Sequence, residues 1–101
     1  MITKNKFEIF LDASYYDMWC LRKIGCKDLD CTLHFYTQED AQDALQFVVD
    51  LSNLGSDRSM RVESVDSVYT VVASNGSSLP EVSGGNRGAI HAVSVILDWI
   101  R

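Results

Sequence analysis

Two different hydrophobic periods divide this chain and limit what it can fold into. Apolar and polar side chains alternate through residues 6–12 and again through residues 31–36, as in strands with one buried face. From residue 37 onward the apolar spacing becomes that of an amphipathic helix. The change of period predicts a domain that combines strands and helices.

Residues 15–24 fit either kind of element. Ser14, with an acid three residues later, resembles a helix-capping box, whereas the aromatic residues of this segment favour a strand. The apolar residues surround a helical wheel without leaving a polar stripe. We therefore predict a strand that forms a hairpin with residues 6–12.

Thr37 begins the clearest helical segment, because its hydroxyl can cap a helix whose third residue, Asp40, is acidic. Apolar residues then recur at helical spacing up to Gly55. They are Ala41, Ala44, Leu45, Val48 and Val49.

The second half of the chain predicts three further segments. Residues 60–73 are rich in valine, tyrosine and threonine and predict one bent strand, or two short strands around Asp66 and Ser67. Residues 74–88 have the composition of a flexible loop. Residues 87–101 predict a second amphipathic helix. The apolar residues expected on one face of this helix are Ala89, Ile90, Val93, Ile96, Leu97 and Ile100, of which Ile90, Val93, Leu97 and Ile100 are expected in the core.

The predicted element order is β-β-β-α-β(β)-α. Its simplest packing is an α+β fold, in which an antiparallel sheet of about 4–5 strands carries two helices on one face. The 101 residues, of which 47% are hydrophobic, suit a single domain over residues 1–101.

The charge of the chain is negative and uneven. Nine basic and fourteen acidic side chains give a formal charge of −5, which opposes direct binding to nucleic acid. Residues 28–57 contain seven acids and no lysine or arginine. Helix-start preferences and solubility explain part of this bias, but an acidic patch also steers association with a basic partner. The expected patch contains Asp28, Asp30, Glu39, Asp40, Asp43 and Asp50.

Three cysteines are an odd number, which suits a reducing, cytoplasmic compartment better than a disulfide scaffold. The candidate zinc ligands are Cys20, Cys26, Cys31 and His34. Their spacing lacks the close pairs of structural zinc sites, and strand alternation turns Cys31 and His34 to opposite faces. We therefore expect buried thiols, with no metal and no other cofactor.

No hydrolase, metalloprotease or phosphate-loop motif occurs in the chain. A cysteine–histidine pair formed across the sheet is the remaining catalytic alternative. However, His34 and His91 share no sequence motif with a cysteine. We expect no enzyme activity.

Two other features have binding potential. A sheet with only two helices leaves part of one face open, and tyrosine and tryptophan are typical of binding hot spots. The aromatic candidates are Tyr15, Tyr16, Trp19 and Tyr36. Arg87 follows a glycine-rich segment at a helix start, a pattern that also binds anions.

These observations favour a small acidic, non-enzymatic domain that binds a protein partner with a basic surface, such as a nucleic-acid-binding enzyme. Inhibitors, immunity proteins and accessory proteins of mobile elements belong to this class. The alternatives are a homodimeric structural module joined through its open sheet face, and a small-ligand or metal-binding protein. No membrane partner is expected, because no apolar run approaches the length of about 18 residues that a bilayer span needs.

Overall fold

The computed structural model describes residues 2–55 and 57–101, except for the side chain of Leu29. Within them, five strands and two α-helices follow the predicted order. Their bounds are β1 Phe7–Asp12, β2 Met18–Lys23, β3 Thr32–Phe35, α1 Gln38–Ser52, β4 Met60–Val65, β5 Val68–Ala73 and α2 Gly85–Ile100. Two short 3-10 helices, η1 and η2, cover Lys4–Lys6 and Leu29–Cys31. The α+β class and the antiparallel pairing are confirmed.

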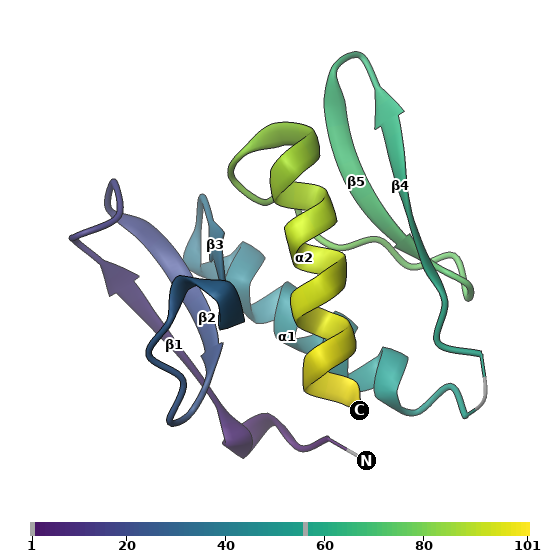
Figure 1. Ribbon diagram of the computed structural model, residues 1–101, viewed down its shortest axis with the longest axis horizontal. Coiled ribbons are helices and arrows are strands. Elements are labelled where there is room, and N and C mark those ends of the chain that lie inside the picture. The colour runs from purple at the N-terminus through teal and green to yellow at the C-terminus, as the bar shows by residue number, and fades with distance from the viewer. Residues whose placement is uncertain (1, 56) are drawn as a thin grey trace.

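The strands divide into two sheets, where a single sheet was expected. β1, β2 and β3 form one sheet, and β4 and β5 form a separate hairpin in the described part of the chain. The segment before α2 already covers the outer edge of β3. There the Ser83 N–H donates to the His34 carbonyl at 3.3 Å, and Val82 bridges to Phe35. The hairpin therefore lies beyond α2 instead of extending the sheet (Figure 1).

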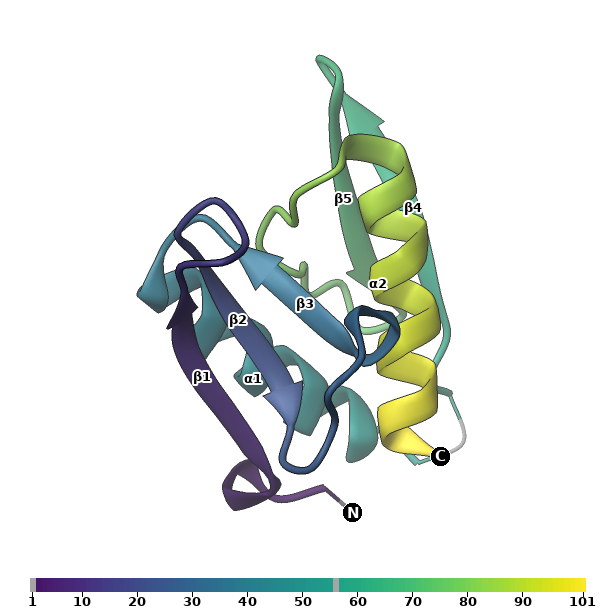
Figure 2. The same cartoon turned by 60° about the vertical axis from the view of Figure 1, so that its left-hand side comes forward.

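The two helices have different neighbours. α1 covers one face of the three-stranded sheet, which lies in front of it in Figure 2. α2 lies between β3 and the β4–β5 hairpin and contacts both. The prediction of two helices on one face of one sheet is corrected accordingly. The physical reason is that the apolar side of α2 is wide enough to contact β3 on one flank and the β4–β5 hairpin on the other. Within the described residues, neither helix has the length and apolar composition needed to cross a membrane.

Local sequence signals explain the turns and the first helix. The Asp40 N–H donates to Thr37 Oγ1 at 3.0 Å, which confirms the predicted cap of α1. Asp66 and Ser67 have φ angles of 52° and 66° and form the two-residue turn between β4 and β5. The hairpin predicted between residues 6–12 and 15–24 is also confirmed, with its second strand beginning at Met18.

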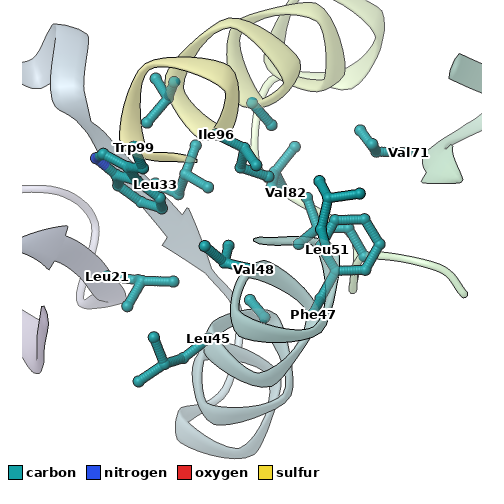
Figure 3. Close-up of a cluster of buried hydrophobic side chains, with 14 of the residues drawn as sticks. Leu21, Leu33, Leu45, Phe47, Val48, Leu51, Val71, Val82, Ile96 and Trp99 are labelled. Carbon is teal, nitrogen blue, oxygen red and sulfur yellow. The ribbon is translucent and has the colours of Figure 1, made fainter. Parts of the chain in front are cut away.

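The core lies where the sheet, α1 and α2 meet. Figure 3 shows Leu21 and Leu33 from the sheet converging with Val48 of α1 and Ile96 of α2. From the hairpin, Val71 adds to the same cluster. One continuous core thus joins both sheets through α2.

The core face of α2 matches the predicted face only in part. Ile100 is buried and Val93 half-buried, but Ile90 and Leu97 are 56% and 38% exposed. The helix buries Ala89, Ile96 and Ile100 of the predicted face, together with Ala92, Val95 and Trp99. The Trp99 ring packs edge-on against Phe7, with 5.1 Å between ring centroids. Burying this large ring favours a rotation of α2 that exposes Ile90 and Leu97.

The segment predicted as a flexible loop is anchored at two points. Leu79 and Val82 are buried, and the Leu79 N–H donates to the Val71 carbonyl at 2.9 Å. α2 begins at Gly85, two residues before the predicted start at Arg87. The flexibility of residues 74–88 stays a prediction.

Candidate functional site

Asp12, Cys20 and His34 lie on the same face of the three-stranded sheet. Cys20 is paired across β2 and β3 with His34, and Asp12 ends β1 two residues after Phe10, the β1 partner of Cys20. Successive side chains of a strand point to opposite faces. Because Leu21 and Leu33 point into the core beside α1, Cys20 and His34 point away from α1.

The polar atoms of these three residues converge. His34 Nε2 lies 3.1 Å from Asp12 Oδ2, although their strands are separated by β2. The Cys20 sulfur lies between them in the sheet, and the three candidate ligand atoms are all within 4.8 Å of one another. The side chains of Cys20 and His34 are buried, and that of Asp12 is half-buried.

The β1–β2 turn holds this cluster in place. Asp12 Oδ1 accepts hydrogen bonds from the Ser14 N–H at 3.1 Å and from the Ser14 hydroxyl at 2.6 Å. The Tyr15 ring stacks on the His34 imidazole, with 3.9 Å between ring centroids. Asp12 and His34 are therefore fixed by neighbours as well as by each other.

The environment shifts the pKa values of Asp12 and Cys20 in opposite directions. The Ser14 hydroxyl and then His34 lower the pKa of Asp12, so this residue is a carboxylate near neutral pH. Burial raises the pKa of the Cys20 thiol to about 11, although Arg22 acts in the opposite direction. The structure thus forms the cysteine–histidine pair that the sequence left open, but with a neutral, buried thiol. Such a thiol is a poor nucleophile.

Two hollows flank His34. One has a volume of about 340 Å³ and is lined by Arg22, Lys27 and Asp28 together with the three clustered residues. The other, of about 320 Å³, is lined by Arg87 and His91 at the start of α2. Arg87 is exposed and has no ion pair in the described residues. Arg87, the predicted anion contact, thus lines a hollow that His34 also lines.

Cys26 and Cys31 form a disulfide across the β2–β3 connection. Of the three cysteines expected to be buried thiols, only Cys20 is one. In this disulfide form, two of the four zinc donors considered from the sequence are bonded to each other. A pairing across only five residues has no sequence signal that distinguishes it from two free thiols.

The predicted acidic patch separates into two groups. Asp28 lines the hollow on the face of the sheet away from α1, and Asp30 follows it in the same connection. The other four acids belong to α1, on the opposite side of the sheet, where Glu39, Asp43 and Asp50 are exposed and Asp40 is half-buried. The structure therefore brings together the acids of α1 but not all six residues.

The outward face of α1 has no positive charge. Its exposed side chains include Glu39, Gln42, Asp43, Gln46 and Asp50. None of these acids takes part in the four ion pairs found in residues 2–55 and 57–101. Only Asp50 has a side-chain partner, the Gln46 amide at 2.8 Å. We name this surface the acidic face, defined by Glu39, Asp43 and Asp50.

The four aromatic candidates do not form one surface. Tyr16 and Tyr36 are 88% and 55% exposed, whereas Tyr15 stacks on His34. Trp19 is half-buried and packs against the core. Tyr15 and Trp19 thus have structural contacts that account for their presence.

A basic hollow was not predicted from the sequence. Its volume is about 320 Å³, and Lys6, Lys23, Arg58 and Arg101 line it together with Trp99. These four cations are far apart in the sequence, so no local charge pattern predicts that they lie together. Ser52, at the end of α1, also lines this hollow. Positive charge therefore gathers near the C-terminal end of α1, where the helix dipole favours it.

Comparisons with protein-family models, curated proteins and solved structures find no match to this chain. The functional argument therefore depends on the geometry and charge described above.

Proposed function

We propose that this chain is a small protein-interaction domain whose acidic face steers association with a basic surface on a partner protein. The observation that carries the proposal is the run of exposed acids along α1 without any ion pair in the described residues. Acids that stabilise their own fold are commonly hydrogen-bonded or paired. Exposed acids without a cationic partner contribute little to stability and leave their charge available to a second molecule.

The position of the acidic face suits an encounter surface. α1 is capped by Thr37 and anchored by a fully buried stripe that includes Ala41, Ala44 and Val48, so its outward charges are held on a rigid element. Asp43 and Asp50 are seven residues apart, close to two helical turns, and project from the same side. A rigid row of like charges raises the association rate with a surface of opposite sign.

The partner class follows from this charge. A basic protein surface is complementary to the acidic face, and the nucleic-acid groove of an enzyme is one such surface. A domain that occupied this groove would act as an inhibitor, an immunity protein or an accessory factor of a mobile element. This function requires no catalytic residue and no cofactor.

Affinity capture from cells that encode the chain, with quantitative mass spectrometry, tests the proposal. The wild type is compared with Asp43→Asn/Asp50→Asn, which removes two charges from the acidic face. The control is Asp17→Asn/Asp66→Asn, which removes the same charge from exposed turns where asparagine tolerates the positive φ angles. We expect a basic protein that the control retains and the α1 variant loses. Equal recovery by all three proteins would contradict the proposal.

A second candidate function is self-association, because α2 and the hairpin expose apolar surface. Ile90 and Leu97 of α2 line a hollow of about 350 Å³ together with Met60 and Val62 of β4. β4 pairs only with β5 among the described strands, so its other edge has no strand partner. Unpaired strand edges beside apolar surface favour pairing with a second copy.

Sedimentation analysis distinguishes this alternative. A dimer that dissociates in Ile90→Glu, but not in Asp43→Asn/Asp50→Asn, would favour self-association through α2 and β4. A monomer at all accessible concentrations would exclude it.

The compartment of the domain is a separate question. The odd cysteine count predicts the cytoplasm, whereas the Cys26–Cys31 disulfide is typical of oxidising compartments. We retain the cytoplasmic location as a proposal that differential alkylation of the protein inside cells tests. Reduced Cys26 and Cys31 would support it, and a fully formed disulfide would contradict it.

A further inference from the structure

We propose that Asp12, Cys20 and His34 form a binding site for a zinc-class divalent cation, with one coordination position open to solvent. This inference is independent of the acidic face of α1. It also differs from the expectation of no metal, which considered the three cysteines with His34 and did not include Asp12.

The distances suit a common central ion. Tetrahedral zinc with ligand bonds of about 2.0–2.3 Å separates its nitrogen and oxygen ligands by about 3.3 Å, and its sulfur from either by about 3.5 Å. His34 Nε2 and Asp12 Oδ2 are already 3.1 Å apart. With all three ligand atoms within 4.8 Å of one another, shifts of about 1 Å or less place them around one ion.

The ligand types select the class of cation. Mg²⁺ and Ca²⁺ favour sites made of oxygen ligands, whereas one thiolate, one imidazole and one carboxylate form the mixed set that Zn²⁺ accepts. The bound Cys20 thiolate and the Asp12 carboxylate carry two negative charges, which balance the charge of the ion. The site therefore adds no net positive charge beside Arg22.

The surroundings already position the ligands. Asp12 Oδ1 is occupied by both hydrogen bonds from Ser14, which leaves Oδ2 directed to His34. Tyr15 stacks on the imidazole, and all three ligands belong to strands of one sheet. Neighbours of this kind orient metal ligands and raise their affinity.

The fourth position faces the hollow that Arg22 and Lys27 line. Three protein ligands with one exchangeable position characterise zinc sites that bind water or a small ligand. Arg22 is held over the Phe10 ring, with 4.6 Å from its guanidinium carbon to the ring centroid, and also pairs with Glu8. Lys27 is exposed, so its charge favours water, hydroxide or a small anion as the fourth ligand.

The test uses tag-free full-length protein, stripped with a chelator and titrated with Co²⁺ and Zn²⁺. Binding to Cys20 replaces the thiol proton, so a sulfur-to-cobalt charge-transfer band should appear and about one proton per chain should be released. We expect one ion per chain and displacement of Co²⁺ by Zn²⁺. His34→Gln, Asp12→Asn and Cys20→Ala should each weaken binding by about tenfold or more.

Two control variants identify the site. His91→Gln removes the other histidine, and Cys26→Ser/Cys31→Ser removes the other two cysteine sulfurs, so both should bind as the wild type does. Circular dichroism before titration shows which variants fold, and Ser14→Ala supplies a milder change that should weaken binding while leaving all three ligands. Wild-type protein without a cobalt–sulfur band would overturn the proposal. Binding that persists in His34→Gln, or is lost only in Cys26→Ser/Cys31→Ser, would do the same.

Discussion

His34 on β3 contacts Asp12 on β1 across the middle strand, with 3.1 Å between Nε2 and Oδ2, although β1 and β3 do not pair. This contact passes over Cys20 on β2. It joins the two outer strands of the sheet through side chains, because their backbones do not pair. Because the Asp12 carboxylate also accepts two hydrogen bonds from Ser14, the fold stabilises its charged form.

The pKa of Asp12, lowered first by the Ser14 hydroxyl and then by His34, predicts a stability that depends on pH. A carboxyl group with a lower pKa in the folded than in the unfolded state stabilises the fold above its unfolded pKa of about 4. This contribution disappears as the pH falls through the folded pKa. We expect Asp12→Asn to lower the free energy of unfolding by about 1–3 kcal/mol at pH 7, the range for a charged hydrogen bond. The difference from the wild type should shrink below about pH 4.

Urea unfolding between pH 2 and pH 7 measures this difference, with Asp17→Asn as the control at an exposed turn. A wild-type advantage over Asp12→Asn that stays constant through the acid range would contradict the predicted titration.

The orientation of α2 predicts that alanine substitutions at two adjacent residues lower the free energy of unfolding by different amounts. Ile96 is fully buried, so Ile96→Ala should lower the free energy of unfolding by about 2–5 kcal/mol. Leu97 is 38% exposed, and Leu97→Ala should cost less than about 1 kcal/mol. Chemical denaturation of both variants gives the comparison. A larger loss for Leu97→Ala than for Ile96→Ala would contradict this orientation of α2.

Gly88 predicts an exception to ordinary helix propensity. Alanine usually stabilises a helix interior by about 1 kcal/mol relative to glycine. However, a Cβ on Gly88 would lie 1.9 Å from the Ser83 carbonyl oxygen. Gly88→Ala should therefore cost about 1–3 kcal/mol through overpacking, whereas Ser94→Ala, at an exposed position of α2, should be neutral or stabilising. A stabilised Gly88→Ala protein in thermal unfolding would disprove the close approach.

The Cys26–Cys31 disulfide predicts a measurable but limited stabilisation. A cross-link that closes such a short loop contributes about 2 kcal/mol in the chain-entropy model. Cys26→Ser/Cys31→Ser should lose about this amount, and dithiothreitol should lower wild-type stability similarly without affecting the variant. Should the reductant leave the wild type unchanged in denaturant titrations, the disulfide does not stabilise the fold.

Periodicity and capping predict the fold of this chain well because these signals are local. The alternation before Asp12, the Thr37 cap and the turn at Asp66 each act within a few residues, and each corresponds to an observed element. The core face of α2 was predicted only in part, because its apolar residues span a wider arc of the helix than the arc that is buried. Its buried side was selected by long-range contacts such as that between Trp99 and Phe7.

The candidate site also depends on long-range contacts that local sequence patterns do not predict. Alternation places Cys20 and His34 on sheet faces, but only the register of the three strands brings both beside Asp12. The basic hollow likewise combines residues from both ends of the chain and from the loop before β4. A charge bias within a single helix can be recognised from the sequence, so the acidic residues of α1 were predicted. Their separation from Asp28 and Asp30 was not predicted, because it depends on the sheet that lies between the two groups.

The association rate with the captured partner tests the central proposal most directly. Stopped-flow mixing across an ionic-strength series compares the wild type with Asp43→Asn/Asp50→Asn and with the Asp17→Asn/Asp66→Asn control. Charges that steer encounter act mainly on association and are screened over about 8 Å at physiological salt. The acidic-face variant should therefore associate several-fold more slowly than the wild type and the control at low salt, with rates converging at high salt and with an unchanged dissociation rate. Equal association rates for all three proteins at every ionic strength would contradict the assignment of the acidic face as the partner-binding surface.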